Sequence, residues 1–319
     1  MHAFHLMPAD SDVAIVAFSN LRLPADDGFH FQTLMESFPD VSRLLVRDPS
    51  ELWYNAGLPG IGETVEEIAA WLRTKLAELG AERVVTVGTS MGGYAAILFG
   101  CMVGARRALA LAPQSLLDVR LPALVPPPEV NRQVIDLEPV MRDFPQTEVD
   151  VVFGRDSILD VFHAQRIGVL DSVRLLSPQR SGHLIARQLK REGRLRELVD
   201  EALESGATGD WPAAPAIEPE LLERLREGLF AWRRDWTEVE KAIAPVAARY
   251  PDWPAPHAAL AKATLRMADR DGVRRSLATA AQAGPCGHRL GRRIERAKTL
   301  VDEGRFDEAD DALGFLMLC

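Results

Sequence analysis

The stretch ERVVTVGTSMGGYAA runs from Glu82 to Ala96, and the interpretation of the whole chain starts from it. Its centre, Gly88 to Gly92, has the pattern G-x-S-x-G around Ser90. The β-branched run before this pattern is typical of a strand, and the apolar run after it is typical of a helix. Small residues let the chain turn sharply between the two, which raises the serine from the carboxyl end of the strand. In that setting Ser90 is a candidate nucleophile.

Short β-rich runs alternate with longer helical patterns on either side of this stretch. Such alternation predicts a mostly parallel sheet with helices on both faces, which is an α/β fold. We expect the strands at residues 13–18, 42–46, 83–87, 107–111, 149–153 and 172–176, and the helices at 61–79, 94–102, 159–169 and 182–203.

Two segments interrupt this alternation. Residues 114–147 contain the sequence PALVPPP, whose prolines exclude a helix or a central strand. We interpret the segment as an excursion over the sheet, either a small cap or a long surface loop. Residues 205–217 are rich in Gly, Pro and Ala and are typical of a linker. The expected domains are therefore 1–204 and 218–319.

The second domain shows helical periodicity that repeats. Similar segments begin at Leu229, Leu265 and Leu300, which are 36 and 35 residues apart, and each pairs two helices through a charged turn. The third copy, AKTLVDEGRFDEADDAL, resembles tetratricopeptide repeats, whose period is about 34 residues. This resemblance implies stacked helix pairs with a concave surface for a protein partner. The alternative is a plain helical bundle packed on the first domain.

Two later strands end in residue types that would activate a serine. The strand at 149–153 runs into Asp156, and the last predicted strand runs into the sequence SPQRSGHLIA, which contains His183. A serine at a strand-to-helix turn requires an acid and then a histidine further along the chain. Because the carboxyl ends of parallel strands meet at one edge, both side chains are predicted to lie beside Ser90.

Each of these two roles has one alternative. Asp160 lies four residues after Asp156, and we prefer Asp156 because it follows the strand end more closely. The other interpretation of Asp156 is a helix N-cap in the sequence DSILD. Among the seven histidines, His163 competes with His183, but it falls inside a predicted helix and is interpreted as structural.

Three motifs, VGTSMGG, VVFGRDSILD and RSGHLIA, resemble those of serine hydrolases with the α/β-hydrolase fold, over residues 12–204. The resemblance implies an oxyanion site made by the backbone N–H of Met91 and by a second N–H in the loop after an early strand. The His-Gly pair that is usual in this loop is absent here. Asn20 is therefore the expected second donor, with Ser19 as the alternative.

The resulting hypothesis is a serine esterase or deacylase that uses Ser90, His183 and Asp156, acts on a small-molecule or glycan ester, and requires no metal or cofactor. Trp53 and Tyr54 are candidate substrate contacts, unless they simply pack their loop against the domain. Two other functions use the same pattern. One is acyl transfer to a hydroxyl or amine, and the other is a non-catalytic interaction protein built on a hydrolase fold.

Composition excludes several other classes of protein. The chain has 319 residues and a net charge of -9, so it lacks the basic excess of a nucleic-acid-binding protein. Its three cysteines, Cys101, Cys286 and Cys319, are far apart and follow no metal or redox spacing. Neither a membrane span nor a signal peptide is indicated by the apolar runs. A cytoplasmic protein is therefore expected.

Overall fold

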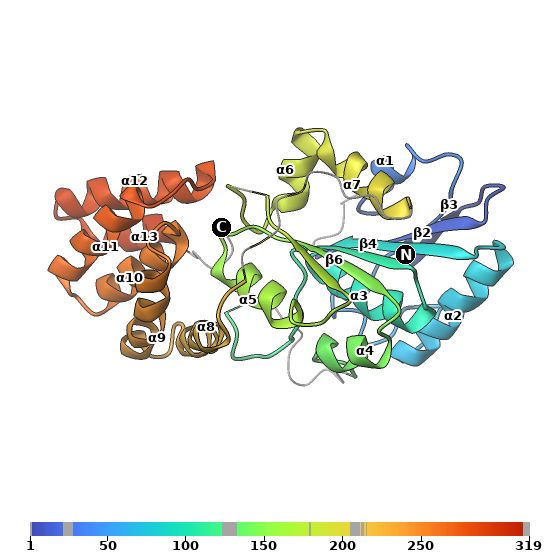
Figure 1. The fold of residues 1–319 in the computed structure, drawn as a ribbon, viewed down its shortest axis with the longest axis horizontal. Coiled ribbons are helices and arrows are strands. Elements are labelled where there is room, and N and C mark those ends of the chain that lie inside the picture. The colour runs from blue at the N-terminus through green and yellow to red at the C-terminus, as the bar shows by residue number, and fades with distance from the viewer. Residues whose placement is uncertain are drawn as a thin grey trace.

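A seven-stranded sheet forms the centre of the larger domain in the computed structural model (Figure 1). The structure describes residues 2–21, 28–122, 133–178, 180–204, 211, 214 and 216–314. The strands are β1 (Phe4–Met7), β2 (Val13–Phe18), β3 (Ser42–Val46), β4 (Arg83–Thr89), β5 (Arg107–Leu111), β6 (Glu148–Val152) and β7 (Val173–Leu176).

The strand order is β1-β3-β2-β4-β5-β6-β7. All neighbours pair in parallel except β1, which runs antiparallel to β3 at one edge. All six predicted strands are present, and the predicted α/β fold, a mostly parallel sheet with helices on both faces, is confirmed. Strand β1 was not predicted from the sequence, because its mixed sequence FHLM is only partly buried at the edge of the sheet.

Alternate residues of each strand pack against opposite layers of helices. In β2, Ala14, Val16 and Phe18 face one apolar core, whereas Ile15 and Ala17 face the other. The first core is covered by α2 (Val65–Glu78), α3 (Met91–Val103), α4 (Leu137–Asp143) and α5 (Ile158–Ile167). The second is covered by α1 (Gln32–Met35), α6 (Ile185–Arg191) and α7 (Arg194–Leu203).

The helix predicted at 182–203 is in fact two helices. Gly193 separates α6 from α7 and adopts a φ of 74°, a left-handed conformation that interrupts a helix and that glycine accepts without a steric penalty. The break lets both helices turn their apolar sides toward the same face of the sheet. This arrangement leaves the start of α6 close to the carboxyl edge of the strands, where β7 ends.

The described part of segment 114–147 packs against the helices that cover one face of the sheet. Its helix α4 packs on α3, and Leu116 forms an isolated antiparallel bridge with Asp136. The proline-rich residues 123–132 lie outside the described residues. The interpretation of this segment as a cap therefore stays a prediction.

Within the described residues 216–314, six helices follow one another, and each packs against the next along the chain. Each charged turn predicted from the sequence joins two of them, so the helices follow one another as three pairs. Whether they are tetratricopeptide repeats stays a prediction. The helices are α8 (Pro219–Ala231), α9 (Trp236–Arg249), α10 (Pro254–Arg266), α11 (Arg270–Gln282), α12 (His288–Asp302) and α13 (Phe306–Leu313).

The described residues of the predicted linker form hydrogen bonds with the first domain. Trp211 is buried, and its indole N–H donates to Glu201 at 2.6 Å. The backbone N–H of Ala214 donates to the carbonyl of Leu175 in β7, and that of Ile217 donates to the Gln165 side chain. These contacts hold α8 against α5 and place the second domain beside the carboxyl edge of the sheet (Figure 1).

Candidate active site

Ser90 lies at a sharp turn between β4 and α3. Its backbone has a φ of 54° and a ψ of -118°, a conformation that is strained for a residue with a side chain. The Ser90 N–H holds this turn in place by donating to the Leu111 carbonyl at 2.9 Å. The turn lifts the hydroxyl above the carboxyl edge of the sheet, as the G-x-S-x-G pattern predicted.

Two glycines allow this turn because the backbone passes too close for a β-carbon. A β-carbon on Gly88 would lie 2.0 Å from the Gly92 carbonyl oxygen, and one on Gly92 would lie 2.3 Å from the Phe18 carbonyl oxygen. The second contact brings the start of α3 next to the end of β2. The loop after β2 therefore lies beside the serine.

A continuous hydrogen-bonded chain connects Ser90, His183 and Asp160. The Nε2 atom of His183 lies 3.1 Å from the Ser90 hydroxyl, and its Nδ1 atom lies 2.8 Å from Oδ1 of Asp160. In the tautomer that satisfies both contacts, Nδ1 donates to the carboxylate and Nε2 accepts from the hydroxyl. An imidazole held in this way can remove the hydroxyl proton as the serine attacks an electrophile.

The preference for Asp156 over Asp160 is corrected by this geometry. Asp156 turns toward the second domain, where its Oδ2 accepts the Gly287 N–H at 2.7 Å. The helix N-cap in this segment is Ser157, whose side chain accepts the Asp160 N–H. Because α5 begins there, Asp160 falls in the first helical turn and faces His183, and its side chain is only 2% exposed.

The pKa values of His183 and His163 are shifted in opposite directions. Burial opposes the imidazolium form of His183, but the charge of Asp160 and its hydrogen bond together raise the His183 pKa above its usual 6.5. Burial, with smaller contributions from Arg166 and His183, lowers the pKa of His163 to about 3. The structural interpretation of His163 fits this position, because it is buried in α5 near Ser115 and stays neutral.

In the described part of the loop after β2, the backbone donors differ in whether they are already used. The Ser19 N–H is already used, because it donates to the Val46 carbonyl at 2.9 Å. Within the described residues, neither the N–H of Asn20 nor its buried Oδ1 has a hydrogen-bond partner. Met91 begins α3, so its N–H is one of the first-turn donors that lack an intrahelical acceptor. The oxyanion roles of Asn20 and Met91 stay predictions that this arrangement permits.

Trp53 and Tyr54 lie in the interior of the protein instead of facing a substrate. Their side chains are 2% and 0% exposed. The Tyr54 hydroxyl donates to the Ser19 carbonyl at 2.8 Å, and the Trp53 indole N–H donates to Gln114 at 2.6 Å. The structure therefore does not support the interpretation of these rings as substrate contacts, and it agrees with the alternative that they pack the loop. The sequence offered no signal for this role.

The described residues contain no group of three His, Cys, Asp or Glu side chains that could hold a metal ion. None of the described helices is both long enough and apolar enough to cross a membrane. The site itself presents the serine, the imidazole, the carboxylate and the nearby backbone donors.

No protein-family model and no curated protein sequence matches the chain. Among solved structures, carboxylesterase CesB (YbfK) from Bacillus subtilis is 15% identical with a TM-score of 0.44, over 64% of this chain and 88% of that chain. A lipase-esterase related protein from Clostridium acetobutylicum ATCC 824 is 13% identical with a TM-score of 0.42, over 62% of this chain and 98% of that chain.

A capsule O-acetyltransferase of Neisseria meningitidis serogroup A is 15% identical with a TM-score of 0.42, over 61% of this chain and 90% of that chain. Likenesses at this level of TM-score and identity do not bear on activity.

Proposed function

We propose that the chain is a serine hydrolase that cleaves carboxylic esters through an acyl-enzyme. The observation that carries this proposal is the hydrogen-bonded chain from Asp160 through His183 to Ser90, at a strained turn where a strand meets a helix. A serine hydroxyl is a weak nucleophile on its own, so it requires a base that is itself held in place. All three elements of that requirement meet here.

The proposed reaction begins when Oγ of Ser90 attacks the ester carbonyl carbon and His183 takes the hydroxyl proton. Asp160 stabilises the resulting imidazolium. The backbone N–H groups of Met91 and Asn20 stabilise the oxyanion, a contribution of about 3 kcal/mol each in comparable sites. His183 then gives the proton to the leaving alcohol. Water, activated by the same imidazole, attacks the acyl-serine, which releases the carboxylic acid and restores the hydroxyl.

A fluorophosphonate probe tests the nucleophile directly. Labelling of the intact chain is expected, and Ser90→Ala should abolish both labelling and the hydrolysis of phenyl acetate. Ser276→Ala, in helix α11 of the second domain, is a matched control that should keep both. Labelling that survives Ser90→Ala would rule out the proposal.

The fate of the acyl group distinguishes hydrolysis from transfer. We expect free acid and alcohol in equal amounts when glycerol or a simple sugar is added at high concentration. An acylated acceptor in place of the free acid would show that the acyl-enzyme reacts with a hydroxyl, and the assignment would change to an acyltransferase.

We also propose that residues 1–204 form the catalytic domain and residues 218–319 a domain of tetratricopeptide-like helix pairs. The three charged turns between paired helices support this division. Residues 205–217 connect the two, and the described residues Trp211, Ala214 and Ile217 contact the first of them.

A further inference from the structure

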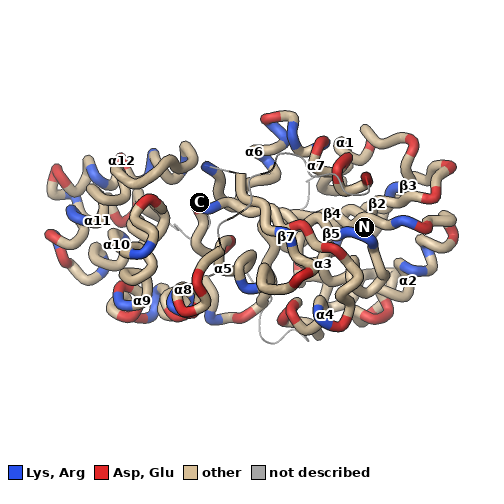
Figure 2. Tube along the Cα trace, in the orientation of Figure 1, with Lys and Arg blue, Asp and Glu red and all other residues tan. Residues whose placement is uncertain are grey.

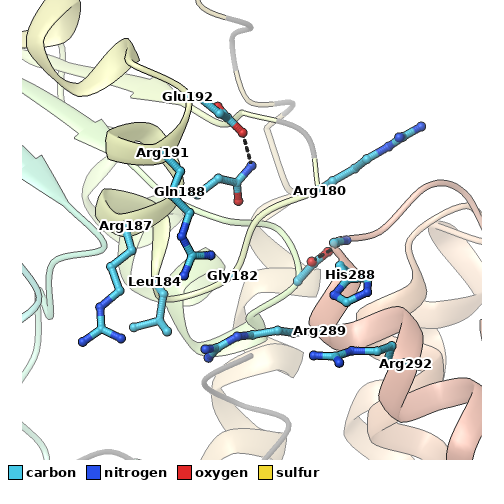
Figure 3. A pocket seen from close by; sticks show the side chains of 12 residues that line it. Arg180, Gly182, Leu184, Arg187, Gln188, Arg191, Glu192, His288, Arg289 and Arg292 are labelled. Carbon is cyan, nitrogen blue, oxygen red and sulfur yellow. Dashed lines mark hydrogen bonds between the residues drawn. The ribbon is translucent and has the colours of Figure 1, made fainter.

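A cleft of about 470 Å³ lies between α6 of the first domain and the beginning of α12 of the second (Figure 3). Its lining includes Gly182 and Leu184, the two neighbours of His183 in the chain. The cleft therefore borders the segment that carries His183, although neither His183 nor Ser90 is among its lining residues. Its volume falls within the range of about 300–1,000 Å³ that is common for small-molecule sites.

Arginine dominates the charge of this cleft. Five arginines line it: Arg180, Arg187 and Arg191 come from the first domain, and Arg289 and Arg292 come from α12. Figure 3 shows the α6 and α12 arginines on opposite sides of the opening. Since each domain contributes part of this set, the charge concentration exists only in the assembled chain.

These five guanidinium groups have no anionic partner. Within the described residues none of them forms an ion pair or a side-chain hydrogen bond, whereas Arg174 binds Asp150 and Arg166 binds Asp136. The cleft also holds two acids, but Asp156 accepts from Gly287 and Glu192 accepts from Gln188. Burial raises the Asp156 pKa to about 6, which weakens its value as a counter-charge below neutral pH.

The concentration of positive charge is local. The whole chain carries a net charge of -9, and acidic and basic residues are interspersed over both domains (Figure 2). Unpaired arginines around a concave surface repel one another, and a bound anion relieves that repulsion. The guanidinium group is also the side chain best shaped to bind phosphate or carboxylate through two parallel hydrogen bonds.

One arginine of the cleft, Arg187, also lies near the segment that contacts the loop after β2. Burial lowers the pKa of the His30 imidazole, and the positive charge of Arg187 lowers it further. The backbone N–H of His30 donates to the hydroxyl of Ser19, in the loop beside Ser90. Arg187 thus lies near both the cleft and the segment that contacts the loop of Ser19.

We infer that the ester cleaved at Ser90 carries phosphate or carboxylate groups, and that these groups bind in the arginine cleft between α6 and α12. This inference rests on the proposed function. The ester carbonyl lies at Ser90, and the anionic part of the substrate extends past His183 to the five arginines. The second domain then acts as a specificity element, since Arg289 and Arg292 supply its half of the cleft.

Three phenyl acetates that differ in charge test this inference. They are phenyl acetate, which is neutral, 5-acetoxyisophthalate, with two carboxylates, and 4-acetoxyphenyl phosphate. We expect kcat/KM for one or both anionic esters to exceed that for phenyl acetate by about tenfold or more, mainly through KM, because hydrogen bonds to charged groups are strong. The anionic ester that is preferred identifies the group that the cleft binds.

The double variant Arg289→Ala/Arg292→Ala links that preference to the cleft. Both side chains are exposed on α12, so their removal leaves the apolar core intact. The variant should lose the preference for the anionic ester and keep its activity on phenyl acetate. Arg275→Ala, exposed on α11 and outside the cleft, is the matched control and should change neither. Equal kcat/KM values for neutral and anionic esters, or an unchanged preference in the double variant, would overturn the inference.

Direct binding separates failure of this inference from failure of the proposed function. Calorimetry of the intact chain with tripolyphosphate and with citrate should show binding of at least one, weakened about tenfold or more in the double variant. Binding should also weaken as salt is added. If esters are cleaved through Ser90 but neither anion binds, the inference is wrong and the proposed function stands. If no ester is cleaved, the proposed function fails, and the substrate assignment fails with it.

Discussion

Asp156 and Asp160 are four residues apart, one before and one within the first turn of α5, yet they contact different parts of the molecule. Asp160 holds His183, and Asp156 holds Gly287 in the second domain. We expect Asp160→Asn to lower kcat for phenyl acetate by about 10³–10⁴, because an amide favours the wrong histidine tautomer. Asp156→Asn should retain kcat within a few fold. Steady-state kinetics of the two variants under identical conditions decides between these carboxyl groups, and the reverse order of effects would contradict the assignment.

His183 determines how the activity depends on pH. As a base it must be neutral, so kcat/KM should be low at acidic pH and rise as His183 loses its proton. Because Asp160 raises the His183 pKa, the midpoint of this rise should lie above the usual 6.5. Asp160→Asn removes that charge and should move the midpoint to lower pH in whatever activity remains. A pH–rate profile of both proteins measures this shift, and a midpoint that is the same in both would contradict it.

At the scale of secondary-structure elements, the turn from β4 to α3 depends on glycine where two backbones meet. Gly92→Ala would place a β-carbon against the Phe18 carbonyl and push the start of α3 from the loop that carries Asn20. We expect a loss of more than tenfold in kcat together with a lower Tm. Circular dichroism melts and ester kinetics would measure both quantities.

Gly104→Ala is the matched control for that change, since Gly104 ends the same helix. Its φ is 67° and no atom lies near its missing β-carbon, so alanine there costs about 1–2 kcal/mol of backbone strain. We expect a lower Tm with unchanged kcat/KM. An equal loss of kcat in both variants would mean that the glycines act through stability alone.

At the scale of the whole molecule, the protonation of Asp156 makes the stability of the folded chain depend on pH, at a contact between the two domains. Its pKa is raised by burial from 3.8 to about 6, so the folded chain holds this proton more tightly than the unfolded chain does. The free energy of unfolding should therefore fall as pH rises from about 4 to about 6, by up to about 3 kcal/mol. Above that range the carboxylate stays charged and the loss is complete.

Asp156→Asn should remove the loss of stability that the charged carboxylate causes, because an amide has no charge. The amide oxygen can still accept the Gly287 N–H. Relative to the natural chain, the variant should be more stable near pH 7.5 and equally stable below pH 4, as urea denaturation at several pH values would show. Asp40→Asn, at an exposed turn, is the control and should show no comparable gain. A gain that is independent of pH would indicate a cause other than the carboxyl charge.

The parts of the site that could be predicted from the sequence are those that depend on local pattern. The apolar runs predicted six of the seven strands, and the order of Ser90 and His183 along the chain placed both at one sheet edge. The choice between the two aspartates could not be made in this way, because it depends on the residue at which α5 begins and on the direction that its first turn faces. The burial of Trp53 and Tyr54 likewise depends on partners that are distant in sequence.

Local residue patterns were sufficient for the parallel sheet, the strand-to-helix turn around Ser90 and the all-helical second part, since periodicity and steric limits on the backbone act over a few residues. Only the folded chain revealed that Asp160 holds His183, that Tyr54 supports the loop of Ser19, and that arginines about a hundred residues apart line one cleft. Those relations depend on the tertiary packing of the chain, because burial, hydrogen bonding and charge act between side chains that are close in space wherever they lie in the sequence.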